Sequence, residues 1–339
     1  MGTAETLASE AVRALAAGDF SVLAARFADA GFMVALPAPG ILQIKSAGAH
    51  EVHEAQARAS VLLSVGVHGD ETGPIDMLAG LLDALSLQAH ELAVDLMVCV
   101  GNPAAIRAGQ RFIEADLNRM FKAERGALAR AVEAQRADVL IAATEAFFSG
   151  AGARRWHLDL HAAIRPSAYP TFAVVPELID AEGKAALLAW LGQAAIGAII
   201  MNPKSAGTYS YHSAQHCGAC ASTVELGRVG ALGQNDLSLF ADVGLALDGL
   251  LRQIEPLPQA AKSAPHLFNV AQEIIKLSDD FRMGFDRNTQ NFTALPAGAV
   301  IATDGAKTYT VQHVEELVLF PNPDVRVGLR AGLMVVRRA

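Results

Sequence analysis

The sequence has few cysteines, no excess of basic charge and no long uncharged hydrophobic run. Three cysteines in 339 residues exclude a disulfide framework and fit a reducing compartment. A formal net charge of −8 argues against nucleic-acid binding, which normally requires a basic surface. No charge-free apolar stretch reaches the length of a transmembrane helix, and the first ten residues lack the features of a signal peptide. We therefore expect a cytoplasmic protein with neither nucleic-acid nor membrane partners.

The composition is that of a globular protein with a large core. Hydrophobic residues make up 52% of the chain and charged residues 18%, which excludes disorder. A chain of 339 residues holds one large domain or two unequal ones. Because the net charge is negative, an anionic substrate would have to be attracted by locally placed arginines.

Apolar strands alternate with amphipathic helices through most of the chain, which predicts an α/β fold, a sheet with helices on both faces. The predicted helices are within 4–30 (broken at Gly18), 72–87, 122–148, 181–194 and 237–254, and the predicted strands are 32–36, 41–45, 60–67, 92–100, 156–160, 171–175, 196–201 and 221–226. In such sheets, functional sites form just beyond the carboxyl ends of the strands.

The composition changes near Pro256 and Pro258, which indicates a domain boundary. Short β-like runs follow, at 299–303, 309–312, 316–320 and 333–336. We therefore predict a catalytic domain over residues 1–261, which includes an N-terminal helical segment (1–45), and a small β-rich domain over 262–339.

Two histidines and a carboxylate stand where this architecture places an active site. His68 and Glu71 follow the apolar run that ends at Val67, and His161 closes the run from Trp156. Two histidines and one carboxylate form the open three-ligand set of a catalytic zinc site, and a tight turn at Gly69 would let the first two face one point. The alternative is that His68 is a surface histidine and Glu71 an acid at a helix N-terminus. Short motifs of this kind also occur by chance.

Two further carboxylates, Glu225 and Asp159, could assist a reaction at the predicted zinc site. Glu225 is free to act as the general base of a metal-assisted hydrolysis. Asp159 lies on the same strand face as His161, where it would orient a zinc-binding imidazole or instead pair with Arg154 or Arg155. We do not expect His157 to be a fourth ligand, because a catalytic zinc site keeps that position open.

The segment from Arg111 to Arg119 supplies groups that suit an anionic substrate. Arg111 is suited to stabilise the oxyanion of a tetrahedral intermediate. Asn118 and Arg119 combine an amide with a forked guanidinium, which can bind a carboxylate in a bidentate manner. The alternative is a solvated surface loop with Arg119 in a salt bridge, but its position between a strand and a helix favours a site.

Two further segments have weaker signals. Cys217 and Cys220 form a C-x-x-C pair without the context of a redox or zinc motif, and we interpret both as small buried residues. The loop 204–212 contains Gly207, Tyr209 and Tyr211 and has the composition of a substrate-facing loop. A packing role for its tyrosines is an equal alternative.

Four segments together resemble the succinylglutamate desuccinylase/aspartoacylase family, part of the wider zinc-carboxypeptidase fold. They are VHGDE with His68 and Glu71, GNPAAIRAGQRFIEADLNRMF with Arg111 to Arg119, DLH with His161, and TVELG with Glu225. The resemblance extends from about residue 60 to residue 236, and the tail from about residue 262 suits the β domain of the family. It implies a zinc-carboxypeptidase-like mixed sheet flanked by helices, with a small C-terminal β-rich domain.

Residue by residue, the resemblance implies the roles that the side-chain chemistry also suggests. It makes His68, Glu71 and His161 the ligands of one zinc ion per subunit, and Glu225 the general base and later the acid. It makes Arg111 the group that polarises the scissile carbonyl. Asn118 and Arg119 then hold a carboxylate of the substrate.

The resemblance also implies an activity, hydrolysis of N-succinyl-L-glutamate to succinate and L-glutamate, the last step of arginine breakdown by the succinyltransferase route. The stretches 207–210 and 233–236 resemble the desuccinylase branch, and Leu226-Gly227-Arg228 stands where aspartoacylases usually carry Val-Gly-Pro. The alternatives are an aspartoacylase-like deacylase of another N-acyl amino acid and a non-catalytic zinc-binding homologue. The expected partner is a small anionic N-acyl amino acid, and a homo-oligomer is compatible with the sequence.

Overall fold

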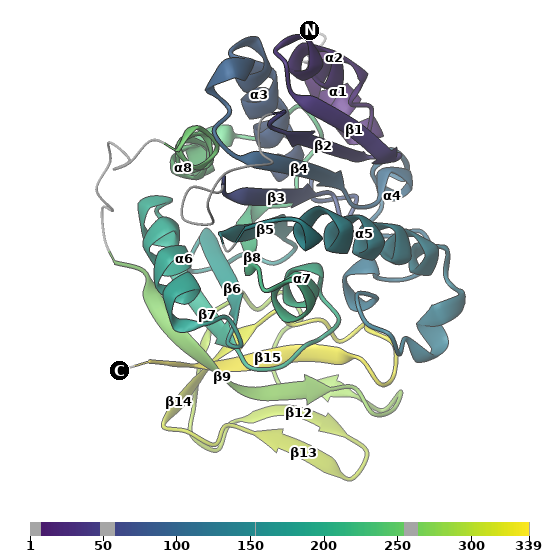
Figure 1. Cartoon of the computed structure of the whole chain (residues 1–339). Coiled ribbons are helices and arrows are strands. Elements are labelled where there is room, and N and C mark those ends of the chain that lie inside the picture. Colours follow the sequence, from purple (N-terminus) through teal and green to yellow (C-terminus); the bar gives the residue numbers. More distant parts are fainter. Residues whose placement is uncertain (1–7, 48–57, 153, 254–263, 339) are drawn as a thin grey trace, which may run out of the picture.

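A mixed sheet of twelve strands runs through the computed structural model, which describes residues 8–47, 58–152, 154–253 and 264–338 (Figure 1). In spatial order the strands are β1 (Met33–Ala38), β2 (Ile41–Lys45), β4 (Asp95–Val100), β3 (Ser60–Val65), β5 (Arg155–Ala163), β8 (Cys220–Arg228), β6 (Thr171–Pro176), β7 (Ala198–Asn202), β9 (His266–Ile275), β15 (Arg330–Arg337), β14 (Glu315–Leu319) and β11 (Ala294–Pro296). A separate three-stranded sheet contains β10 (Arg282–Met283), β12 (Val300–Asp304) and β13 (Lys307–Thr310).

The centre of the large sheet is parallel and buried. Strands β4, β3, β5 and β8 run parallel to one another, and every residue of β3 is buried. Because both faces of this strand are covered, apolar side chains do not alternate with exposed polar ones, and Val61, Leu62, Leu63 and Val65 are all apolar. Their carboxyl ends therefore meet at one edge of the sheet.

Eight α-helices surround the sheet in the described part of the chain: α1 (Glu10–Ala17), α2 (Ser21–Asp29), α3 (Gly73–Leu87), α4 (Pro103–Ala108), α5 (Val132–Ser149), α6 (Ala181–Gln193), α7 (Tyr209–Cys217) and α8 (Ala241–Arg252). Helices α3 and α7 both pack against β5 and β8. Helix α3 also packs against α8, and α7 against α5, so two groups of helices cover the central strands. The α/β fold class predicted from the sequence is confirmed. None of these helices is long and apolar enough to span a membrane.

The N-terminal helices follow the prediction, although residues 1–7 lie outside the described part. Helix α1 begins after Ser9, whose side chain accepts a hydrogen bond from Val12 N at 3.2 Å. It ends at Gly18, where φ is +70°, a left-handed conformation that glycine adopts without a steric cost. The break predicted at Gly18 is therefore confirmed, and α2 follows.

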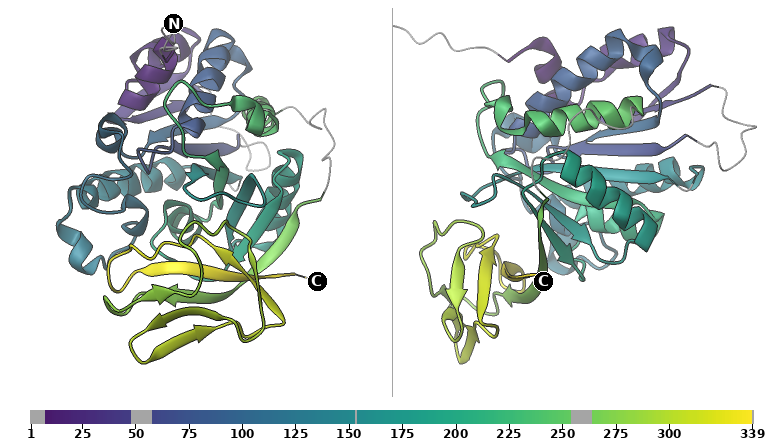
Figure 2. Two further views of the ribbon diagram at one scale, coloured as in Figure 1. Left: turned by 180° about the vertical axis from the view of Figure 1, so that it is seen from behind. Right: turned by 90° about the vertical axis from the view of Figure 1, so that its left-hand side faces the viewer.

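The C-terminal strands continue the large sheet at one end of the molecule, coloured green to yellow in Figures 1 and 2. Strand β9 pairs in parallel with β7 and antiparallel with β15. The β-rich C-terminal part is therefore confirmed, but its first strand, β9, is hydrogen-bonded to β7 of the catalytic part. The predicted boundary at residues 261 and 262 lies outside the described residues, and the division into two domains stays a prediction.

Two local predictions are wrong. The helix predicted over 122–148 begins only at Val132, because Gly126 has φ +52° and residues 126–130 form a 3-10 helix instead. The loop predicted over 204–212 becomes helical at Tyr209. Its residue types favour a helix weakly, so tertiary contacts stabilise it: the Tyr209 ring stacks on Phe121 at 4.3 Å between centroids.

Candidate metal centre and active site

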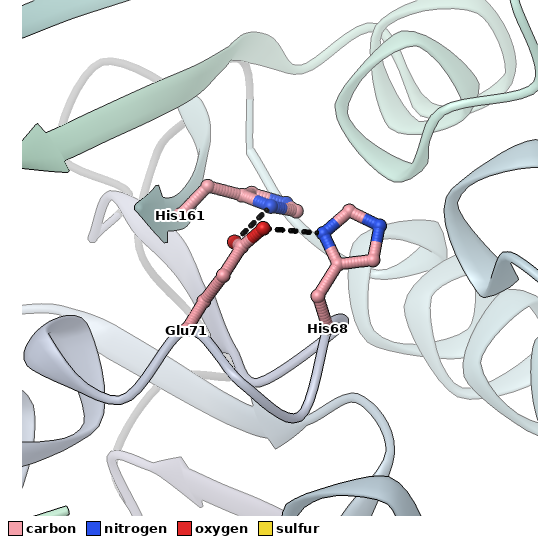
Figure 3. Close-up of side chains that lie close together, drawn as sticks. All are labelled: His68, Glu71 and His161. Carbon is pink, nitrogen blue, oxygen red and sulfur yellow. Dashed lines mark hydrogen bonds and ion pairs between the residues drawn. The ribbon is translucent and has the colours of Figure 1, made fainter. Parts of the chain in front are cut away.

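Two histidines converge on one carboxylate at the edge of the sheet (Figure 3). Nδ1 of His68 lies 2.8 Å from Oε1 of Glu71, and Nδ1 of His161 lies 2.8 Å from Oε2. All three side chains are buried, and one donor atom of each lies within 4.8 Å of the others. Within the described residues this is the one group of three or more such side chains with that spacing.

The turn that carries His68 and Glu71 depends on a glycine. A Cβ atom added at Gly69 would lie 2.2 Å from Ala105 C and 2.5 Å from Gln110 O. Gly69 N also donates a hydrogen bond to Arg111 O at 3.1 Å. The backbone of the turn therefore packs directly against the segment that leads to Arg111, and a side chain at this position would displace it.

Parallel strand register places His161 beside Glu225. His161 in β5 is paired with Glu225 in β8, so both side chains project to the same face of the sheet. Glu225 is buried. Burial, followed by the charge of Glu71, raises the pKa of Glu225 to about 7 against the opposing effects of His161 and Arg111. A carboxylate with a pKa near neutrality is suited to take up and release a proton.

Each imidazole has a second carboxylate on its other nitrogen. Nε2 of His68 lies 2.9 Å from Oδ1 of Asp116, and Nε2 of His161 lies 3.0 Å from Oδ2 of Asp159. Asp159 also accepts a hydrogen bond from Ser64 at 2.5 Å. Burial opposes ionisation of Asp159, but His161, His157 and Ser64 together outweigh it and lower the pKa of this carboxyl. Such carboxylate–histidine pairs fix the orientation of metal-binding imidazoles.

Asp159→Asn is expected to weaken metal affinity by about 10- to 100-fold, because the amide no longer supports the Nε2 proton of His161 in the same way. Titration of the metal-free protein with Zn²⁺ against a competing chelator measures the affinity. Asp304→Asn is the matched control, since Asp304 is also buried but bonds to Ser278 and Leu277. An affinity equal to that of the unaltered chain would mean that Asp159 does not act on the metal centre.

The segment from Arg111 to Arg119 is held by a buried glutamate. The carboxylate of Glu133, in the first turn of α5, accepts hydrogen bonds from the backbone N–H groups of Ile113, Glu114 and Ala115. At one end of this segment, Arg111 Nη1 lies 2.7 Å from Oε1 of Glu71. Arg111 is therefore in contact with the histidine–carboxylate cluster.

The other end of the segment forms the 3-10 helix η3 (Leu117–Arg119). Asn118 accepts a hydrogen bond from Tyr209 N at 2.9 Å and lies 3.5 Å from Nε2 of His161. Arg119 Nη2 lies 3.8 Å from Oδ2 of Asp116. The amide and this guanidinium therefore stand beside the same cluster as Arg111.

A cavity of about 420 Å³ joins these groups, within the range of small-molecule sites. All seven candidate site residues line it: His68, Glu71, Arg111, Asn118, Arg119, His161 and Glu225. Part of the cavity wall comes from the C-terminal part of the chain and includes Phe320, Arg326 and Arg330. The sequence-based prediction did not include any residue of this part of the wall.

Other side chains singled out in the sequence have structural contacts. His157 is buried between Ser64 and Ser213, at 2.9 and 2.6 Å, and burial lowers its pKa to about 4. It is therefore neutral and lies outside the cluster. Cys217 and Cys220 are both free thiols, and burial raises the pKa of each to about 11, which makes them unreactive.

The tyrosines of the segment 204–212 do not line the cavity. Tyr209 is fully buried, and its hydroxyl lies 2.6 Å from Oγ1 of Thr144. Tyr211 donates to Pro203 O at 3.1 Å. From this segment it is Thr208 and Ser210 that line the cavity. The packing role of the tyrosines is therefore the one the structure favours.

The three clustered side chains fit a divalent metal ion. Two imidazole nitrogens and a carboxylate form a donor set that binds zinc and leaves one position open. Both imidazoles have the carboxylate partner that metal-binding histidines usually have. A buried site of this kind, beside a further carboxylate and several arginines, is the site of a metal-dependent hydrolase.

The chain belongs to the succinylglutamate desuccinylase/aspartoacylase family. The family model of the Succinylglutamate desuccinylase/Aspartoacylase catalytic domain matches residues 57–249, and that of the AstE/AspA barrel-sandwich hybrid domain matches residues 263–338. The resemblance inferred from the four sequence segments is therefore confirmed.

Relatives over most of the chain are named succinylglutamate desuccinylase. One from Burkholderia orbicola (strain MC0-3) is 43% identical over 299 residues, which cover 88% of this chain and 85% of the relative. The crystal structure of one from Chromobacterium violaceum is 35% identical, with a TM-score of 0.75 over 94% of this chain and 97% of that one. That from Vibrio cholerae is 32% identical, with a TM-score of 0.81 over 90% and 88%.

Proposed function

We propose that this protein is a zinc-dependent amidohydrolase that cleaves N-succinyl-L-glutamate into succinate and L-glutamate. This is the final step of arginine breakdown through succinylated intermediates. The observation that carries the proposal is the convergence of His68, Glu71, His161 and Glu225 on one cavity. The names of relatives that are 41–44% identical, among them those from Burkholderia, support the choice of substrate.

In this proposal the buried cluster holds the metal and Glu225 moves the proton. His68, Glu71 and His161 would hold one zinc ion, which when bound supplies a Lewis acid and lowers the pKa of water. Glu225 removes a proton from the attacking water and later delivers it to the leaving amide nitrogen. Its location in the cavity, without a hydrogen bond to the three cluster residues, leaves it free for this transfer.

The arginines of the cavity explain how an acidic protein binds an anion. N-succinylglutamate carries three carboxylates, whereas the whole chain has a net charge of −8. Five arginines line the cavity: Arg111, Arg119, Arg165, Arg326 and Arg330. Asn118 and Arg119 hold one carboxylate of the substrate. Arg111 donates hydrogen bonds to the carbonyl oxygen as negative charge develops on it.

Arg111→Ala is expected to lower kcat by about 10²–10³, because one donor to the developing oxyanion is lost. The steady-state rate of glutamate release from N-succinylglutamate measures the effect. Arg107→Ala is the matched control, since Arg107 is exposed on the neighbouring helix α4. Turnover of the Arg111 variant close to that of the unaltered chain would remove Arg111 from the mechanism.

The substrate assignment is tested by comparing kcat/KM for N-succinylglutamate and N-acetylaspartate with the zinc-loaded protein. The proposal predicts chelator-sensitive glutamate release that is much faster than aspartate release. Preference for the acetyl substrate would instead indicate an aspartoacylase-like deacylase with the same site. Stoichiometric zinc binding without turnover of either substrate, or of a wider panel of N-acyl amino acids, would indicate a non-catalytic homologue.

A further inference from the structure

A buried arginine of the C-terminal part faces the same cavity as the proposed metal centre. Arg330 is the first residue of β15, where it pairs with Ile275 of β9. Its side chain is 10% exposed and lines the cavity together with Asn118 and Arg119. More than two hundred residues of sequence separate it from Arg119, so only the folded chain brings the two together.

The guanidinium of Arg330 is incompletely paired. Its Nη1 atom is buried, and among the described residues nothing accepts a hydrogen bond from it. The nearest carboxylate oxygen, Oε1 of Glu273, lies 3.7 Å from Nη1, which is too far for a hydrogen bond. Buried charged groups normally have hydrogen-bonded partners. An anion bound in the cavity would therefore supply the acceptor that Nη1 of Arg330 lacks.

The charges around Arg330 also favour binding of an anion beside it. Burial, followed by the positive charge of Arg119, lowers the pKa of Arg330 to about 10 despite the opposing charges of Glu273 and Asp116. Two like charges that face one cavity repel each other unless an anion lies between or beside them. Asp116 does not fully offset the repulsion between Arg119 and Arg330, because its carboxylate is shared between His68 and Arg119.

We infer that Arg330 binds a second carboxylate of the anionic N-acyl amino acid, in addition to the one proposed for Asn118 and Arg119. The inference rests on the proposed function of the site. A guanidinium that presents several N–H groups to a cavity matches a carboxylate in charge and shape. The C-terminal part of the chain therefore supplies a determinant of substrate specificity, and the catalytic part alone lacks it.

Steady-state kinetics of the zinc-loaded Arg330→Gln variant test this inference. On N-succinylglutamate we expect KM to rise by about 10- to 100-fold, the effect of one hydrogen-bonded charge pair, with a smaller change in kcat. Three analogues, in each of which one carboxylate is replaced by an amide, identify the group that Arg330 binds. On one analogue the variant and the unaltered chain should differ by less than about threefold, because the partner of Arg330 is already missing.

Glu273→Gln is the matched control, because it removes the carboxylate nearest to Arg330 without altering a residue that lines the cavity. We expect its KM to stay within about threefold of the unaltered chain. A rise equal to that of Arg330→Gln would mean that the pair is structural and would overturn the inference. Arg330→Lys retains the charge and should raise KM less than Arg330→Gln; if the glutamine variant does not fold, the lysine variant is tested on the same analogues.

Two other results would contradict the inference: an unchanged KM, or an equal penalty on the parent substrate and on all three analogues. If the unaltered chain does not hydrolyse N-succinylglutamate, the proposed function fails, and the role of Arg330 is then decided with succinate as the probe. Titration calorimetry should show at least about tenfold weaker succinate binding in Arg330→Gln. Equal or absent binding in both proteins would overturn the inference.

Discussion

Glu225→Gln is expected to lower kcat by about 10²–10⁴, the usual contribution of a positioned general acid–base, while zinc content stays at one ion per chain. The amide has nearly the same shape but cannot accept the proton of the attacking water. The effect should be large because burial and Glu71 raise the pKa of Glu225 to about 7. That value suits a group that must both take and return a proton near neutral pH.

Turnover and metal content have to be measured on the same preparation. Glu177→Gln provides the control, since Glu177 is an exposed glutamate at the end of β6. Loss of zinc in the Glu225 variant would show that this carboxylate is a ligand and would contradict the roles proposed here. Full turnover with zinc retained would place the general base elsewhere.

His161→Ala is expected to abolish stoichiometric zinc binding and with it nearly all activity. The imidazole supplies one of three donor groups, and its loss leaves Glu71 with one histidine partner. Metal-ion catalysis contributes several kcal/mol, which corresponds to a loss of about 10³ or more in rate. Removal of the metal should also lower stability, by about 4 kcal/mol when zinc is present at a thousand times its Kd.

Metal analysis and thermal unfolding, with and without added zinc, measure both effects. The stabilisation by zinc should disappear in the His161 variant and persist in His90→Ala, because His90 is 79% exposed and does not line the cavity. Zinc binding of unchanged affinity in His161→Ala would mean that the metal sits elsewhere. That result would contradict the proposed centre.

Apolar runs and the resemblance of four segments to a known family together predicted the cluster, because its histidines lie at or near the carboxyl ends of parallel strands. The buried strand before His68 and the one that contains His161 could be recognised from apolar runs. Adjacent parallel strands then carry their carboxyl ends to one edge of the sheet. Tight packing at Gly69 brings Glu71 to the same point. The fold class therefore followed from short-range patterns, whereas the set of converging residues was predicted with the help of the family resemblance.

The supporting groups depend on contacts between distant segments and could not be predicted in this way. Asp116 reaches His68 across 48 positions of the sequence, and Glu133 supports a loop some 20 positions earlier. Asp116 stands inside a segment already singled out, so a search for carboxylates near the arginines could have found it. The sequence around Arg330 does not indicate that this residue lines the cavity, because its position there depends on the pairing of β15 with β9.

Two other differences from the prediction, at helix α7 and strand β9, have a similar origin. Helix α7 contains residues with modest helix propensity, and its first turn is fixed by Tyr209, which contacts Asn118 and Thr144 in other segments. Strand β9 was not predicted because most of its residues are only half-buried, so no clear alternation of apolar and polar residues is present. In both cases tertiary packing determines the local structure.

Stepwise titration of the metal-free protein with Zn²⁺, with glutamate release from N-succinylglutamate as the readout, tests the central claim most directly. The account predicts that the rate rises in proportion to added zinc and reaches its plateau at one equivalent per chain. The same titration of Glu225→Gln should bind one equivalent without comparable glutamate release. A metal-free protein that is already fully active, or a zinc-loaded protein that releases no glutamate, would contradict it.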